Sequence, residues 1–145
     1  MEFLVKGFEE LTKAELYEIL KVRSEIFIVE QKMNCQDMDG VDFNCLHMFL
    51  KDGENIVAYL RAFKNPEDQT AVKIGRVLSL YHGKGLGTEL LKRCILEIKN
   101  HFFCEKITLH SQKSAVAFYE KLGFKITSDE FMEEGVVHQA MEYIL

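Results

Sequence analysis

The chain has 145 residues, 48% of them hydrophobic and 28% charged, so one domain over residues 1–145 with one substantial core is expected. Its net charge of −5 gives no general attraction for nucleic acid or anionic lipid, and we expect no nucleic-acid partner. No run of 18 apolar residues and no signal peptide occur, which predicts a cytoplasmic protein without a membrane partner.

The first half of the chain changes from a strand pattern to a helix pattern and back. Thr12 and Glu15 have the spacing of a capping box, which begins a helix that ends near Glu30. One face of this helix is apolar and carries Leu16, Ile19, Leu20 and Phe27. Residues 31–44 are polar and irregular. Strands are predicted at residues 3–8, 46–51, 56–64 and 71–80.

The second half opens with the glycine turn His82-Gly83-Lys84-Gly85-Leu86-Gly87. A helix is predicted over residues 85–101, because apolar residues recur there at helical spacing: Leu86, Leu90, Leu91, Ile95 and Ile98. The remaining elements are a strand at 106–110, a helix at 114–122, and two strands around the turn Glu133-Glu134-Gly135. Three consecutive strands before the first crossover exclude a purely alternating fold. They predict an α/β fold of α+β character, with a mixed sheet and helices on both faces.

The glycine turn has the features of an anion site. Gly83, Gly85 and Gly87 allow positive φ angles and a close approach of the backbone to a ligand, and the helix behind them offers N–H groups and the positive end of its dipole. Lys84 and His82 add positive charge at the rim, and the whole suits a pyrophosphate. The spacing is neither that of a P-loop nor that of a Rossmann fingerprint. A turn that binds no ligand is the alternative.

A second motif follows about 25 residues later, in the segment Gln112-Lys113-Ser114-Ala115-Val116-Ala117-Phe118-Tyr119-Glu120-Lys121-Leu122-Gly123-Phe124. Together the two motifs resemble those of the GNAT superfamily of acetyltransferases. His82 stands where that family usually has Gln or Arg, and Gln112 stands in place of Asn. The resemblance implies the GNAT acyl-CoA N-acyltransferase fold, with antiparallel N-terminal strands and a splayed parallel strand pair.

The same resemblance implies acetyl-CoA as the cosubstrate. Backbone N–H groups of the turn would hold the pyrophosphate, the strand before it would pair with the pantetheine amides, and Tyr119 would face the thioester sulfur. The implied cofactor-binding residues are Val77, Leu78, Ser79, His82, Gly83, Lys84, Gly85, Leu86, Gly87, Thr88, Gln112, Phe118 and Tyr119.

A narrower resemblance is to the ElaA-like branch of this superfamily, whose signature reads R-x-x-x-F-x-V-E-Q…D-x-D-G-x-D…H. The matching residues are Arg23, Phe27, Val29, Glu30, Gln31, Asp37, Asp39, Gly40, Asp42 and His47. Later matches are Ile74-Gly75-Arg76-Val77 and the ending Glu134-Gly135-x-x-His138-x-x-Met141. The resemblance therefore covers the chain from Leu16 to Met141.

Acetyl transfer to an amine needs a base, an oxyanion donor and a proton for the departing thiolate. Tyr119 suits the last task, although the residue alone would equally fit a packing role. The oxyanion would meet a backbone N–H near Val77 to Ser79, freed by a bulge. Glu30, His110 and His138 are the candidate bases, with water as another route.

Arg61 and Arg76 lie in apolar strand segments, and we expect them to form ion pairs with Asp37, Asp39 and Asp42 rather than to clamp a substrate. No metal is predicted, because the spacing of the acidic and sulfur residues between Cys35 and His47 fits neither zinc nor an EF-hand. The cysteines lack a C-x-x-C pair and are expected to be reduced: Cys35, Cys45, Cys94 and Cys104.

The predicted function is transfer of an acetyl group from acetyl-CoA to a primary amine of a small molecule or a protein, by direct attack in a ternary complex. The enzyme is expected to act as a monomer or a homodimer, without a metal. Two alternatives are a CoA-binding or regulatory module that has lost turnover, and an unrelated phosphate or nucleotide binder, which would leave the Tyr119 motif unexplained.

Overall fold

The computed structural model describes all of residues 1–145 and contains one mixed sheet of eight strands. The strands are β1 (Glu2–Gly7), β2 (Leu46–Asp52), β3 (Asn55–Lys64), β4 (Ala71–Ser79), β5 (Lys106–Gln112), β6 (Lys125–Ile126), β7 (Phe131–Glu133) and β8 (Val136–Ile144). Their order across the sheet is β1-β2-β3-β4-β5-β8-β6, and β7 pairs with the remaining part of β8. The predicted mixed sheet with an antiparallel first half is confirmed.

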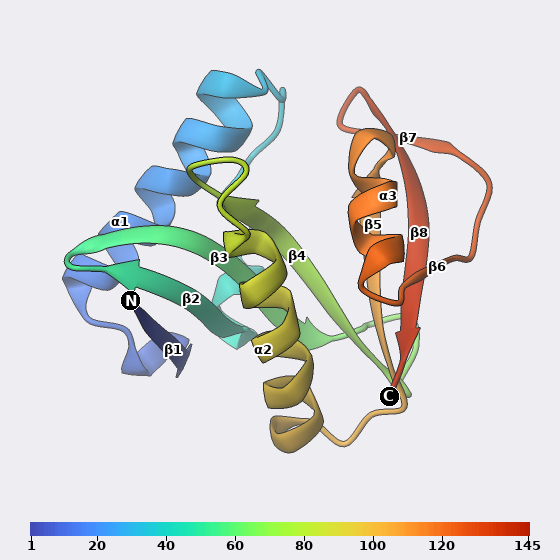
Figure 1. Ribbon diagram of the computed structural model, residues 1–145, viewed down its shortest axis with the longest axis horizontal. Coiled ribbons are helices and arrows are strands. Elements are labelled where there is room, and N and C mark those ends of the chain that lie inside the picture. Colours follow the sequence, from blue (N-terminus) through green and yellow to red (C-terminus); the bar gives the residue numbers. More distant parts are fainter.

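The helices cover both faces of the sheet (Figure 1). They are α1 (Lys13–Arg23), the π-helix η2 (Ser24–Glu30), α2 (Leu86–His101) and α3 (Val116–Lys121), with short 3-10 turns η1 (Phe8–Glu10), η3 (Val41–Asn44) and η4 (Lys113–Ala115). None of these helices is long and apolar enough to cross a membrane.

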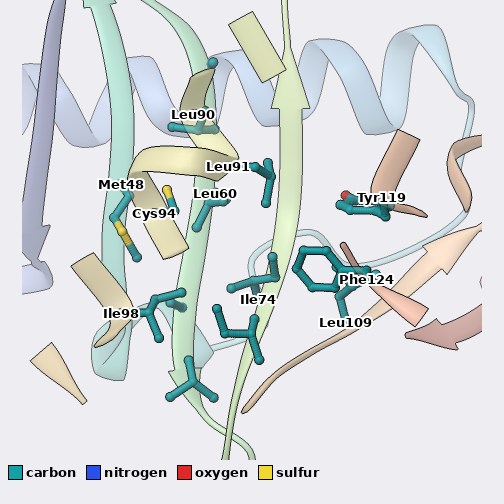
Figure 2. Packing of buried hydrophobic residues seen from close by; sticks show 14 of the residues in the cluster. Met48, Leu60, Ile74, Leu90, Leu91, Cys94, Ile98, Leu109, Tyr119 and Phe124 are labelled. Atoms are coloured by element: carbon teal, nitrogen blue, oxygen red, sulfur yellow. The ribbon is translucent and has the colours of Figure 1, made fainter. Parts of the chain in front are cut away.

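Successive side chains of a strand point to opposite faces of the sheet, which produces one core on each face. In β2, Met48 and Leu50 pack toward α2, whereas Phe49 between them packs toward α1 and η2. Figure 2 shows four residues of α2, Leu90, Leu91, Cys94 and Ile98, directed at the first of these faces. Each fully buried leucine or isoleucine contributes about 1.5–3 kcal/mol to folding, so this apolar stripe fixes α2 on the sheet.

The first helix begins as predicted but changes its winding. The Thr12 hydroxyl accepts from the Glu15 N–H, and the Glu15 carboxylate accepts from the Thr12 N–H, which confirms the capping box. After Arg23 the chain continues as a π-helix, in which the Gln31 N–H donates to the Ile26 carbonyl. A π turn rotates the residues within it and places both Ile26 and Phe27 in the core. Of the predicted stripe, Ile19 and Phe27 are buried, whereas Leu16 and Leu20 are only partly buried.

A wedge opens in the middle of the sheet between β4 and β5. These two strands pair in parallel only where Ala71–Lys73 face Lys106–Thr108, and beyond that short seam they have no common ladder. In Figure 1 they lie together near the C-terminus and diverge toward the opposite end of the molecule. The structure thus shows the splayed parallel pair that the family resemblance implies.

The C-terminal part differs in one respect from the sequence prediction. Three strands, not two, follow α3, and Glu133 lies inside β7 instead of in the turn. The turn is made by Glu134 and Gly135, which both have positive φ angles. All four cysteines are free thiols, as expected.

Candidate active site

A cavity of about 650 Å³ fills the wedge between β4 and β5. One wall is formed by β4 residues 74–77, and the other by β5 residues 109–112 with His138 of β8. The irregular loop from Gln31 to Val41 covers the opening on the α1 side, while Tyr119 reaches the cavity from α3. Gly75 contributes space to it, because a Cβ at this position would have no atom within 4 Å.

Strand β4 bulges where it lines the cavity. Tyr59 faces Leu78 and Arg61 faces Gly75, so the single residue between them on β3 opposes both Arg76 and Val77. Arg76 has a φ of 54°, which is unusual for a side-chain-bearing residue and marks the bulge. The predicted bulge is therefore present, one residue earlier than the segment Val77 to Ser79, and it disrupts the regular pairing of the strand.

Three arginines and three aspartates hold the covering loop to the sheet. Arg23 is fully buried and bonds Asp37 and Asp42, with its Nη1 atom 2.7 Å from Asp42 Oδ1. Arg61 bonds Asp39 through two atoms, at 2.8 and 2.7 Å, and also reaches Asp42. The expected ion-pair network is confirmed, although its Arg61 and Arg76 members also line the cavity.

The electrostatics of this network favour the ionised carboxylates. A hydrogen bond from Arg61 is the main reason that the pKa of Asp39 falls to about 2, despite partial burial. Burial opposes ionisation of Asp42, but hydrogen bonds from Arg23 and Arg61 outweigh it and lower the pKa of that carboxyl. Asp39 and Asp42 are therefore held ionised by their arginine partners.

His47 also holds the covering loop in place through hydrogen bonds. Its Nε2–H donates to the Asp42 carbonyl over 3.0 Å, so its Nδ1 accepts the Tyr59 hydroxyl proton over 2.7 Å. Burial lowers the pKa of His47 and keeps the ring neutral, which fits this pattern. His47 of the ElaA-like signature is therefore a structural residue.

The glycine turn lies between β4 and α2, as predicted, and is exposed from His82 to Gly85. Gly83 and Gly85 have φ angles of 83° and 74°, and Gly85 caps α2. The first i→i−4 bond of the helix runs from the Glu89 N–H to the Gly85 carbonyl, which leaves the N–H groups of residues 86–88 without helical partners.

Gly87 is needed for close packing against Phe118, and not for the predicted positive φ angle. Its φ is not positive, and a Cβ there would lie 3.3 Å from the ring of Phe118. Phe118 packs against the core on the α2 side of the sheet and does not line the cavity, so it lies beside the turn. Leu78 and Leu86 likewise bury their side chains, so these two residues present only backbone atoms to a ligand.

Tyr119 is 7% exposed and packs edge-on against Phe118 and Phe124. Figure 2 shows its hydroxyl oxygen on the side of the ring that faces β4. That hydroxyl has no hydrogen bond in the chain. Arg61 Nε is the only fully buried side-chain nitrogen or oxygen atom without a hydrogen bond, so the Tyr119 hydroxyl is not fully buried and is open to the cavity. Burial raises the pKa of Tyr119, which keeps the phenol protonated.

His138 lies across the cavity and is 4% exposed. Its Nδ1–H donates to the Val136 carbonyl over 2.8 Å, so Nε2 of the neutral ring carries the lone pair. Nε2 has no hydrogen bond, yet it is not sealed from solvent, and Glu133 Oε2 lies 3.6 Å from it. His110 also lines the cavity, with Nδ1 2.8 Å from Glu133 Oε1.

The remaining predicted site residues are distributed around the cavity mouth. Gln112 lines the cavity and donates through Nε2 to Gln31 Oε1 over 2.9 Å, a contact that joins β5 to the end of η2. Glu30 is exposed at the end of η2, does not line the cavity, and does not pair with Arg23.

Glu133 and Cys35 line the cavity and are not among the site residues predicted from the sequence. Glu133 was assigned to a turn, although its position two residues after Phe131 would place it on the same strand face as that aromatic residue. Cys35 was considered only as a reduced thiol and as a rejected metal ligand, because nothing in the loop sequence shows which side chains turn inward.

Comparison with known proteins agrees with this geometry. Residues 17–145 match the model of the acetyltransferase (GNAT) domain. The UPF0039 protein C11D3.02c of Schizosaccharomyces pombe is 36% identical over 97% of this chain and 95% of its own, and ElaA of Escherichia coli is 30% identical over 91% and 89%.

Two solved structures share the fold over nearly the whole chain. An acyl-CoA N-acyltransferase from Pseudomonas aeruginosa superimposes with a TM-score of 0.90 at 30% identity, covering 99% of each chain. The crystal structure of E. coli ElaA gives a TM-score of 0.90 at 29% identity, covering 98% of each chain. The chain therefore belongs to the GNAT acetyltransferase family, in its ElaA-like branch, and is an acyltransferase that takes its acyl group from a CoA donor.

Proposed function

We propose that this enzyme transfers an acetyl group from acetyl-CoA to a primary amine of a small molecule or a protein, by direct attack in a ternary complex. The observation that carries the proposal is the placement of Tyr119 and His138 in one cavity. Tyr119 offers a proton, and His138 offers a lone pair at Nε2.

The chain offers groups for the pyrophosphate and for the pantetheine arm of the donor. The exposed glycine turn presents N–H groups without helical partners to the pyrophosphate, with Lys84 and His82 beside them. The edge of β4 that faces the wedge lacks a strand partner after Lys73, so its amides are available to the pantetheine arm. Gly87, the third glycine of the turn, lets Phe118 approach closely, because a Cβ there would lie 3.3 Å from the Phe118 ring.

Acetyl-CoA supplies the thioester whose carbonyl carbon receives the amine nitrogen. His138 Nε2 takes a proton from the amine, and the Tyr119 hydroxyl donates a proton to the departing sulfur. A backbone N–H at the β4 bulge donates to the carbonyl oxygen as negative charge develops there. The C–N bond forms as the C–S bond breaks, CoA leaves as its thiol, and Tyr119 regains its proton from water through the open cavity.

Direct transfer is favoured over an acetyl-cysteine route. Cys35 is the only cysteine that lines the cavity. Burial and the nearby Glu134 carboxylate raise the pKa of its thiol, despite the opposing charge of Arg76. A thiol held in its protonated form is a poor nucleophile.

Thermal unfolding with and without acetyl-CoA tests the donor, since a ligand of the native state adds RT ln(1 + [L]/Kd) of stability. Saturating acetyl-CoA should raise Tm more than ATP or NAD does. Thiol release with a panel of primary amines then separates an enzyme from a module that only binds CoA. Absence of any Tm shift would refute the proposed donor.

The Cys35→Ala variant tests direct transfer. It should retain wild-type turnover, and mass spectrometry of the wild-type enzyme incubated with acetyl-CoA alone should show no acetylated Cys35. Cys104→Ala, which changes a thiol outside the cavity, is the matched control. Loss of turnover in Cys35→Ala together with an acetylated cysteine would establish the covalent route instead.

A further inference from the structure

Glu133 lies between two histidines that line the cavity. It is the last residue of the three-residue strand β7, and its Oε1 and Oε2 atoms face different rings, His110 and His138. The three side chains come from three strands, β5, β7 and β8, that pair in one part of the sheet. Nothing in the proposed acetyl transfer so far uses the Glu133 carboxylate.

The two rings differ in exposure and in orientation. His138 is buried, with Phe131 stacked on its ring at 6.1 Å between centroids, and its Nδ1–H is fixed by the Val136 carbonyl. His110 is 36% exposed at its side chain and meets the same Phe131 edge-on. Glu133 therefore connects an inner ring with an outer ring that reaches solvent.

His138 takes up the amine proton next to the Glu133 carboxylate. The fixed Nδ1–H leaves Nε2 as the proton-accepting atom, and Glu133 Oε2 is the nearest acidic oxygen at 3.6 Å. A carboxylate so placed stabilises the imidazolium that forms when the amine is deprotonated. Its other oxygen lies 2.8 Å from His110 Nδ1, within hydrogen-bond distance.

We propose that Glu133 is a positioning residue that stabilises protonated His138 and passes the proton to His110, which releases it to water. The inference rests on the proposed role of His138 as base. Two protons move in each turnover. The amine proton passes from His138 Nε2 through the Glu133 carboxylate and His110 to water, and Tyr119 regains from water the proton that it gave to the sulfur. His138 is thereby returned to its neutral form for the next turnover.

Steady-state kinetics of Glu133→Gln test the role in turnover. Its kcat should fall at least tenfold with little change in the KM for the amine, and Glu133→Asp, which keeps the carboxylate, should recover most of the rate. Glu130→Gln is the matched control, because this exposed carboxylate pairs with Lys113 and does not line the cavity. Adding His110→Gln to Glu133→Gln should cause no further loss, since both act in one chain.

A kcat of Glu133→Gln within twofold of the wild type would overturn the inference. The inference would also be overturned if the kcat losses of Glu133→Gln and His110→Gln multiplied in the double variant. An unchanged Tm shift with acetyl-CoA in each variant shows that the fold and the donor site are intact.

NMR spectra of the histidine rings distinguish failure of this inference from failure of the proposed function, because they need no turnover. The ring resonances of His110 and His138 should both move in Glu133→Gln, because each ring contacts the Glu133 carboxylate, and they should keep their positions in Glu130→Gln. Unmoved resonances of both rings in Glu133→Gln would refute the coupling even if the enzyme transfers acetyl groups.

Discussion

Asp37 accepts a hydrogen bond from Arg76 over 2.9 Å, and this ion pair ties the covering loop to the bulge of β4. Arg76 also donates to the Asp37 backbone carbonyl over 3.0 Å. A residue with a side chain at a φ of 54° costs about 1–3 kcal/mol, which surrounding contacts must offset. The Asp37 carboxylate therefore links the covering loop to the bulge.

Asp37→Asn should destabilise the protein by about 3–5 kcal/mol, because the fully buried Arg23 loses a charge partner together with Arg76. Urea denaturation measures the change. Glu89→Gln, which removes an exposed ion pair with Arg93, should change stability by less than about 1 kcal/mol. Equal stability of the two variants would show that the network does not hold the loop.

Tyr119→Phe should lower kcat by about 100-fold while the acetyl-CoA-induced rise in Tm is kept, because only the proton donor is lost. The rate of CoA thiol release at saturating substrates measures kcat. Tyr143→Phe is the control, since Tyr143 packs beside Gly123 and does not line the cavity. Wild-type turnover in Tyr119→Phe would remove this residue from the mechanism.

Gly85→Ala should lower stability by about 1–2 kcal/mol and weaken acetyl-CoA binding about tenfold, because a Cβ at a φ of 74° strains the turn that presents the free N–H groups. Gly53→Ala introduces the same strain at a φ of 63° in the hairpin turn between β2 and β3. That control should lose similar stability and keep its affinity, as isothermal titration calorimetry would show. Equal affinity of both variants would disconnect the turn from the donor.

The stability of the protein should fall in acid partly through Asp39. Its pKa is about 2 in the folded state, below the ordinary value of 3.8, so its contribution is complete above pH 3.8 and is lost as the pH falls through 2. Asp39→Asn should be less stable at neutral pH and should show a weaker decline between pH 4 and 2. Urea midpoints across that range measure this, with exposed Asp129→Asn expected to decline like the wild type.

The regular elements and the family were predictable from the sequence, because local patterns specify them. The capping box at Thr12 and the apolar stripe of residues 86–98 depend on neighbours in the chain, and both predictions are confirmed. The π-helix was not predictable, since a 3.6-residue period continues through Phe27 with no local break. The role proposed for Glu133 was not predictable for another reason. Its partners His110 and His138 become neighbours only when β5, β7 and β8 pair.

The seam between β4 and β5 is only three residues long on each strand. Everything beyond it is a pair of sheet edges facing each other inside the molecule, with main-chain polar groups that no strand satisfies. A ligand with amide groups of its own can lie there as a substitute strand and join the two arms. Binding should then stiffen the molecule across its middle, so that the donor completes the architecture as well as supplying the acyl group.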